Sequence, residues 1–182
     1  MRYSENSYLL YILGGALPSP NLGWPADAKV INFNDFRDQL AHCKENHVEC
    51  QKAPHSHIEE LNVIDCQTRR IIPAPTHCDY VALSYVWGTP QKTSPPGGDF
   101  LPYLLDATIE DALLVTQRLG FKYIWIDRYC IFQEEKDAES KKIQIKNMHL
   151  VYRNAQLTII AAAGDDVTFG LPGVSGKPRI AR

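Results

Sequence analysis

The stretch Tyr-Ile-Trp-Ile-Asp at residues 123–127 decides the fold class of this chain. Aromatic and β-branched residues dominate it, which is typical of a short buried strand. It follows a helix stop at Gly120 and ends at the acid Asp127, after which the chain turns polar. Ligands are usually bound at the carboxyl ends of the strands of an open parallel sheet. We therefore expect any chemistry of this protein to lie just after this strand.

Two further strands and two helices alternate with this stretch. Residues 80–87 (Tyr-Val-Ala-Leu-Ser-Tyr-Val-Trp) and 157–162 (Leu-Thr-Ile-Ile-Ala-Ala) show little alternation of polarity, as expected for strands covered on both faces. Apolar residues at helical spacing predict a helix over 108–119 and a second one that opens at 134–139. The resulting β-α-β-α-β order predicts an α/β fold, with an open, mostly parallel sheet and flanking helices.

Two details of these helices follow from their sequences. Thr108 with Asp111 three residues later is typical of a capping box at the start of the first helix. The inner stripe of the second helix is expected to be Ile145, Met148, Tyr152 and Ala155.

The chain before residue 80 is expected to lead into this core. Residues 1–33 contain three prolines and several glycines and predict an irregular arm. Residues 34–79 predict a helix capped by Asn34 and running to about His47, then a hairpin of two strands over 61–66 and 69–73. With a core domain over 80–176 and a tail over 177–182, this division describes the whole chain.

Cysteine and histidine residues gather near the end of the first helix. Cys43, His47 and Cys50, with His42, His55 and His57 close by, carry the side chains that zinc prefers. Their spacing matches no standard zinc finger, and Cys43 and His47 continue the apolar face formed by Phe36 and Leu40. Packing of this helix is the preferred interpretation, and no metal site is predicted.

Composition narrows the class of protein and its compartment. Of 182 residues, 45% are apolar and 22% are charged, and the net charge of −2 gives no reason to expect a nucleic-acid partner. The five cysteines are odd in number and scattered, which favours a reducing compartment. The apolar run over 8–17 is a poor signal sequence, and no run approaches the ~20 apolar residues of a membrane span. We expect a cytoplasmic protein without a stable membrane anchor.

Candidate site residues cluster where the three strands end, at residues 88–89, 127–128 and 164–165. Asp127 is either a ligand-orienting carboxylate or an acid that caps the next turn or pairs with Arg128. Trp87 could stack on a ring of the ligand or fill the core, and Cys130 is more readily a buried packing residue than a nucleophile. The ligand-binding candidates are Ser84, Trp87, Gly88, Arg128, Cys130, Gln133 and Asp165.

Five stretches taken together resemble the fungal HET (heterokaryon incompatibility) domain family. They are residues 80–88, 108–112, 119–133, 144–163 and 170–174, and with the upstream cysteines and hairpin the resemblance covers roughly residues 40–176. It implies a role in non-self recognition between fungal cells, ending in programmed cell death. HET domains usually stand at the N-terminus of longer proteins whose other parts sense an allelic partner, so the implied partners are a sensor domain, an allelic partner protein or a second copy.

The HET family is in turn distantly similar to TIR domains, which have a flavodoxin-like fold. That similarity implies a 2-1-3 strand order, with a crevice between residues 87–89 and 164–165. Some TIR domains hydrolyse NAD, which makes NAD the candidate substrate and a carboxylate the expected catalytic group.

The sequence conflicts with a TIR-like mechanism of NAD hydrolysis. The similarity implies a catalytic glutamate after the third strand, but no glutamate follows Glu139 in this chain. The catalytic acid would then be Asp127, Glu134 or Glu139. Two residues also depart from the HET pattern, namely Phe132 before Gln133 and His149 after Met148. The alternatives are a module that signals by self-association without chemistry, or an inactive truncated paralogue.

Overall fold

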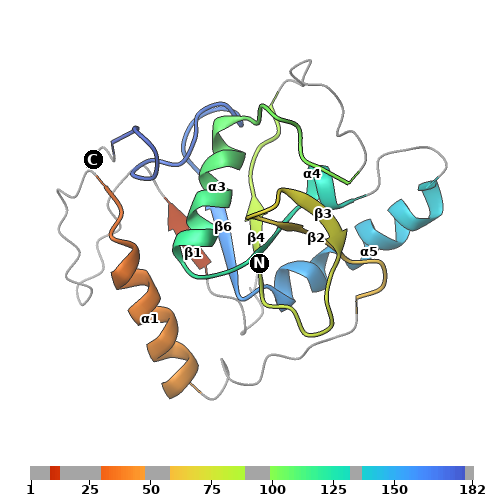
Figure 1. Cartoon of the computed structure of the whole chain (residues 1–182), viewed down its shortest axis with the longest axis horizontal. Coiled ribbons are helices and arrows are strands. Elements are labelled where there is room, and N and C mark those ends of the chain that lie inside the picture. Colours follow the sequence, from red (N-terminus) through yellow and green to blue (C-terminus); the bar gives the residue numbers. More distant parts are fainter. Residues whose placement is uncertain (1–8, 13–29, 48–57, 89–98, 132–136, 179–182) are drawn as a thin grey trace.

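The computed structural model describes residues 9–12, 30–47, 58–88, 99–131 and 137–178 of the chain. They form an α/β structure built on one six-stranded open sheet with the strand order β1-β6-β4-β5-β2-β3 (Figure 1). The elements, in chain order, are β1 Leu9–Ile12, α1 Phe33–Asn46, β2 Asn62–Asp65, β3 Arg70–Pro73, β4 Tyr80–Ser84, α3 Ala107–Arg118, β5 Tyr123–Ile126, α4 Asp127–Cys130, α5 Ala138–Asn154 and β6 Leu157–Ala161.

The three predicted strands lie side by side and run parallel, with β4 between β5 and β6. In register, Ala82 of β4 faces Trp125 on one side and Thr158 on the other. The predicted 2-1-3 order of these strands is therefore confirmed. Because β4 is covered on both faces, its first four residues are almost fully buried, which explains its unbroken apolar sequence.

The predicted hairpin is confirmed as β2 and β3, and it extends the sheet. Strand β2 pairs antiparallel with β5, so Ile64 faces Ile124. The carboxylate of Asp65 accepts hydrogen bonds from the amides of Gln67 and Thr68, at 2.9 and 3.0 Å, and so fixes the turn. Three of the five strand pairings in the sheet are parallel and the two of the hairpin are antiparallel.

Strand β1 was not expected from the sequence. Leu9–Ile12 pairs parallel with β6 within the stretch that we predicted to be an irregular arm. An isolated run of four residues has too little periodicity to be recognised as a strand. The neighbouring β6 supplies the pairing that the local sequence does not reveal.

The capping box predicted for α3 is wrong. The helix begins at Ala107 after Asp106, and the Asp106 side chain makes no capping hydrogen bond. Thr108 and Asp111 instead accept hydrogen bonds from the backbone of the segment that follows β6. The predicted helix stop at Gly120 is confirmed, since this residue has a φ of +89°. Helix α3 lies in front of the sheet in the view of Figure 1.

The inner face of α5 matches the predicted stripe at Met148, Tyr152 and Ala155 but not at Ile145. Ile145 is 50% exposed, whereas Gln144 is buried and donates to the carbonyl of Glu60 at 2.8 Å. Tyr152 packs edge-on against Trp125, with ring centroids 5.4 Å apart, and Met148 also packs against the core. The helix begins at Ala138, and residues 132–136 lie outside the described ranges.

Helix α1 begins two residues earlier than predicted, because Asn32 rather than Asn34 provides its cap. The side chain of Asn32 accepts from the amide of Asn34 at 3.1 Å. Phe36 and Leu40 pack against the core as expected, but His47 is exposed. Cys50, His55 and His57 lie outside the described residues, and among those described no three metal-binding side chains lie together.

No helix within the described residues has the length and apolar character needed to cross a membrane.

Candidate functional site

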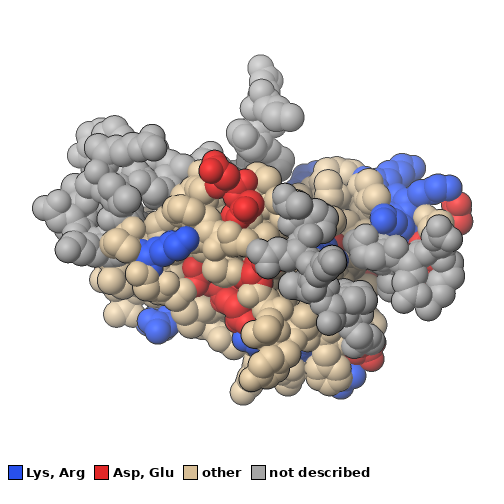
Figure 2. All heavy atoms as spheres, turned by 90° about the horizontal axis from the view of Figure 1, so that it is seen from above, with Lys and Arg blue, Asp and Glu red and all other residues tan. Residues whose placement is uncertain are grey.

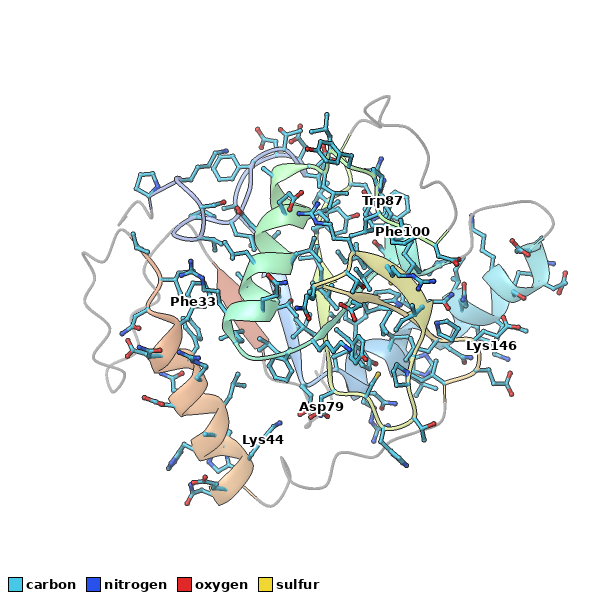
Figure 3. The ribbon with its side chains drawn as sticks, in the orientation of Figure 1. Phe33, Lys44, Asp79, Trp87, Phe100 and Lys146 are labelled. Carbon is cyan, nitrogen blue, oxygen red and sulfur yellow. The ribbon has the colours of Figure 1, made fainter. Side chains whose placement is uncertain are left out.

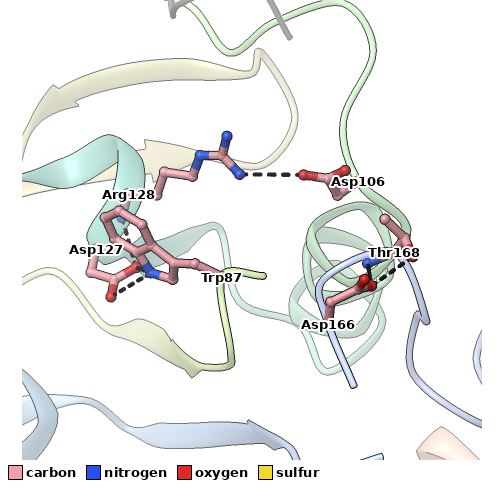
Figure 4. A network of polar contacts seen from close by, with 6 residues as sticks. All are labelled: Trp87, Asp106, Asp127, Arg128, Asp166 and Thr168. Atoms are coloured by element: carbon pink, nitrogen blue, oxygen red, sulfur yellow. Dashed lines mark hydrogen bonds and ion pairs between the residues drawn. The ribbon is translucent and has the colours of Figure 1, made fainter. Parts of the chain in front are cut away.

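The carboxyl edge of the parallel strands brings together residues from two strand ends. Trp87 follows β4 and Asp127 follows β5, and the indole Nε1 donates to both oxygens of the Asp127 carboxylate at 3.0 Å each (Figure 4). Figure 3 shows Trp87 at one end of the sheet and Asp79, which precedes β4, at the other. Parallel pairing of β4 with β5 is what places these two side chains within reach.

The Asp127 carboxyl group lies in an environment that shifts its acidity. The backbone amide of Arg128 donates to Asp127 Oδ1 at 2.7 Å. Burial raises the pKa of this carboxyl above its ordinary value, although the indole of Trp87 and the amide and charge of Arg128 act in the opposite direction. A partly buried carboxyl group of raised pKa at a strand end is suited to exchange protons with a ligand.

The Arg128 guanidinium is engaged by a different acid. Its Nη1 lies 3.3 Å from Oδ2 of Asp106, and both side chains are largely buried (Figure 4). The alternative in which Asp127 forms a side-chain ion pair with Arg128 is therefore not observed. The Arg128–Asp106 pair instead ties the start of α3 to the end of β5.

The third strand end approaches the first through Gly88. This glycine has a φ of +68°, and a Cβ placed on it would lie 2.6 Å from Cβ of Asp166. Asp166 Oδ1 accepts from the amide and the hydroxyl of Thr168, at 2.8 and 2.6 Å, which holds the turn in place. The strand ends therefore meet where the sequence predicted, but Asp166 rather than Asp165 is the acid against Gly88. Asp165 is exposed on the same turn.

Seen from above, this edge carries several acidic side chains near its middle (Figure 2).

Two tyrosines near Asp127 were missed as site residues. Burial raises the pKa of Tyr85 well above its ordinary value, and the charge of Asp127 adds to this effect. Burial also raises the pKa of Tyr152 to about 12, and its hydroxyl donates to the carbonyl of Leu83 at 3.3 Å. The signal for Tyr85 was available, because residues two apart on an extended segment point to the same side and Tyr85 precedes Trp87 by two.

The other predicted residues occupy varied positions. Cys130 is 1% exposed, its sulfur accepts from the amide of Ile126 at 3.4 Å, and burial raises its pKa to about 12. These properties favour the packing interpretation for Cys130. Ser84 is half-buried at the end of β4, and its side chain forms a hydrogen bond with the side chain of Tyr152.

The predicted acids of the second helix lie elsewhere. Glu139 is exposed at the start of α5 and is paired with Lys142 at 2.7 Å. Gln133, Glu134 and Phe132 lie outside the described residues, and His149 is exposed on α5. Among the three predicted catalytic acids, Asp127 is the one that the described structure places at the strand-end edge.

A cavity of about 520 Å³ lies at the opposite, amino edge of the sheet, beneath α1. Its lining includes Lys44 and Lys122, but both are engaged by acids, since Lys44 lies 4.0 Å from Asp79 and Lys122 lies 3.3 Å from Asp65. None of the residues that line this cavity belongs to the Asp127 site.

Comparison with known proteins matches residues 80–181 to the family described as Heterokaryon incompatibility protein (HET). The chain belongs to the HET family. It is also 30% identical over 107 residues to "Heterokaryon incompatibility protein 6, OR allele" of Neurospora crassa. That alignment covers 51% of this chain and 15% of the Neurospora protein, so the HET chain described here spans a small part of that relative. No solved structure matches the chain. The Asp127 site lies wholly inside the region matched to the HET family.

Proposed function

We propose that this HET domain is an effector of fungal heterokaryon incompatibility that promotes cell death by hydrolysing NAD at the Asp127 site. The role in incompatibility is supported by the family match and by the name of the Neurospora relative. The observation that carries the chemistry is the contact between Trp87 and Asp127, which places a partly buried carboxyl group beside a half-exposed indole. A sensor region or an allelic partner protein would control this activity, and the protein would act in the cytoplasm.

The proposed reaction breaks the bond between C1′ of the ribose and the nitrogen of nicotinamide. The bonding electrons go to the pyridinium ring, which leaves as neutral nicotinamide, and a water oxygen forms the new bond to C1′. The Asp127 carboxylate stabilises the positive charge that develops on the sugar and receives the proton lost by water. The products are nicotinamide and ADP-ribose, with one proton released to solvent at the end. The exposed part of the Trp87 ring offers a stacking surface for an aromatic ring of the dinucleotide.

Nicotinamide release from NAD by the purified chain tests this proposal, with and without forced clustering of the protein. Asp127→Ala is expected to lower the rate by at least about a hundredfold, in line with loss of a catalytic acid–base group. Glu139→Ala removes an exposed acid on α5 and serves as the matched control, which should retain the wild-type rate. Absence of release in both the dilute and the clustered protein would remove the enzymatic proposal. Turnover that survives Asp127→Ala would show that another group is the acid.

Exposed apolar side chains that flank residues 89–98 in the sequence favour a second candidate, signalling by self-association. Large apolar residues are exposed on both sides of segment 89–98, namely Val86, Trp87, Phe100, Tyr103 and Leu104. Exposed apolar surface often marks protein–protein contacts. Light scattering over a concentration series is expected to show an increase in mass if this surface drives assembly. A constant monomeric mass would count against it.

A further inference from the structure

The hydroxyl group of Tyr85 is buried and, among the described residues, has no hydrogen-bond partner. Two other core tyrosines show the usual situation. The Tyr80 hydroxyl donates to the carbonyl of Val151 at 2.7 Å, and the Tyr152 hydroxyl donates to that of Leu83 at 3.3 Å. A buried hydroxyl without a partner costs folding free energy, so its presence needs a reason.

The acidic groups around Tyr85 are held by other donors. After burial, the charges of Asp127 and Asp106 further raise the pKa of the phenol, and the charge of Arg128 lowers it. Asp127 accepts from Trp87 and from the amide of Arg128, while Asp106 is paired with the Arg128 guanidinium. The buried Tyr85 hydroxyl takes no part in these contacts among the described residues.

We infer that the Tyr85 hydroxyl is the buried hydrogen-bond donor of the Asp127 site and binds a sugar oxygen of the bound dinucleotide. This inference rests on the proposed function, and it adds a ligand-positioning residue to that function. Because burial keeps the pKa of the phenol high, Tyr85 retains its proton at neutral pH and can donate to a ribose oxygen. The neighbouring Asp127 would contact the same sugar once the ligand replaces Trp87 on the carboxylate. Trp87 is 43% exposed and can leave this contact without unpacking the core.

Tyr85→Phe separates this role from a structural one, with Tyr80→Phe as the matched control. Both substitutions remove one buried phenolic oxygen, but of the two only the Tyr80 hydroxyl has an observed partner, the carbonyl of Val151. Tyr80 lies at the start of β4, away from the Asp127 site. Thermal unfolding of the protein without ligand measures stability. Isothermal titration calorimetry with ADP-ribose, which lacks the bond that is cleaved, measures binding.

Tyr85→Phe is expected to keep or raise the melting temperature and to weaken ADP-ribose binding about tenfold, as for loss of one hydrogen bond to an acceptor then left unpaired. Tyr80→Phe is expected to lower the melting temperature and leave binding unchanged. Unchanged binding by Tyr85→Phe would overturn the inference while the proposed function stands. A fall in melting temperature equal to that of Tyr80→Phe would also overturn it, because the hydroxyl would then have a structural partner. If the wild-type protein binds neither ADP-ribose nor NAD, the proposed function fails and the inference fails with it.

Discussion

The amide nitrogen of Leu171 lies 2.6 Å from Oδ2 of Asp111, across 60 residues of sequence. The other carboxylate oxygen accepts from the Ser175 hydroxyl, and the Thr108 hydroxyl accepts from the amide of Gly170 at 3.1 Å. The first two turns of α3 therefore hold the segment that follows β6. Leu171 is completely buried beside this contact, so the Gly-Leu-Pro-Gly-Val motif at residues 170–174 has a structural role.

Asp111→Ala is expected to destabilise the fold by about 2–4 kcal/mol. It leaves the buried amide of Leu171 without an acceptor, and a hydrogen bond to a charged group is worth about 1.5–3 kcal/mol. Urea denaturation followed by circular dichroism measures the change. Ser175→Ala removes the exposed donor to the same carboxylate and should cost about 1 kcal/mol or less. Equal losses for the two variants would contradict a dominant role for the Leu171 contact.

Gly88→Ala is expected to destabilise the protein more than Gly120→Ala. Both glycines have a left-handed backbone, with φ values of +68° and +89°, so alanine is strained at either position by about 1–2 kcal/mol. Only at Gly88 would the new Cβ also meet another residue, because Asp166 lies 2.6 Å away and nothing lies within 4 Å at Gly120. Overpacking of this kind adds about 1–3 kcal/mol. Thermal denaturation of both variants measures the difference, and equal losses would show that Asp166 moves away at no cost.

The sheet could be predicted from the sequence because its strands carry their burial pattern locally. Residues 80–84, 123–126 and 157–161 are short apolar runs, and the helices between them force parallel neighbours. The meeting of Trp87 with Asp127 follows from the same topology.

Features that depend on distant partners could not be predicted in this way. Thr108 and Asp111 have the same spacing whether they cap their own helix or bind residues 170–171. Gln144 is buried because the carbonyl of Glu60 meets it, and this shifts the inner face of α5 away from Ile145. The role of Tyr85 depends on carboxylates supplied by other elements, whereas a sequence pattern shows only its neighbours.

Cys66 and Cys130 are expected to resist alkylation in the folded protein. Burial raises the pKa of each thiol to about 12, so the reactive thiolate is scarce at about pH 8. Cys43 is partly exposed on α1 and should react first among these three. Iodoacetamide labelling followed by peptide mass spectrometry, with and without urea, measures the order. Native labelling of Cys130 as fast as that of Cys43 would support a reactive role for Cys130.

Asp127 and Asp65 are expected to respond to pH with opposite signs, and Asp65 provides the reference. Its burial acts against the charged form, but the amides of Thr68 and Gln67, together with Lys122, lower its pKa below the ordinary value of 3.8. As the pH rises, the folded protein therefore loses this proton at a lower pH than the unfolded chain does. Asp65 therefore stabilises the fold above pH 3.8, and this stabilisation is lost as the pH falls through the pKa of the folded state.

For Asp127 the sign is reversed, because burial raises the pKa of its carboxyl above 3.8 in the folded protein. At a pH just above 3.8 the folded state keeps a proton that the unfolded chain has released, so stability falls as the pH rises through this window. Asp127→Asn removes this dependence and should gain stability relative to wild type between about pH 3 and about pH 7, whereas Asp65→Asn should lose it. Urea denaturation of both variants across this range measures the two trends. If Asp127→Asn follows the same trend as Asp65→Asn, the Asp127 carboxylate is stabilised rather than strained by its surroundings, and its suitability for proton exchange with a ligand is lost.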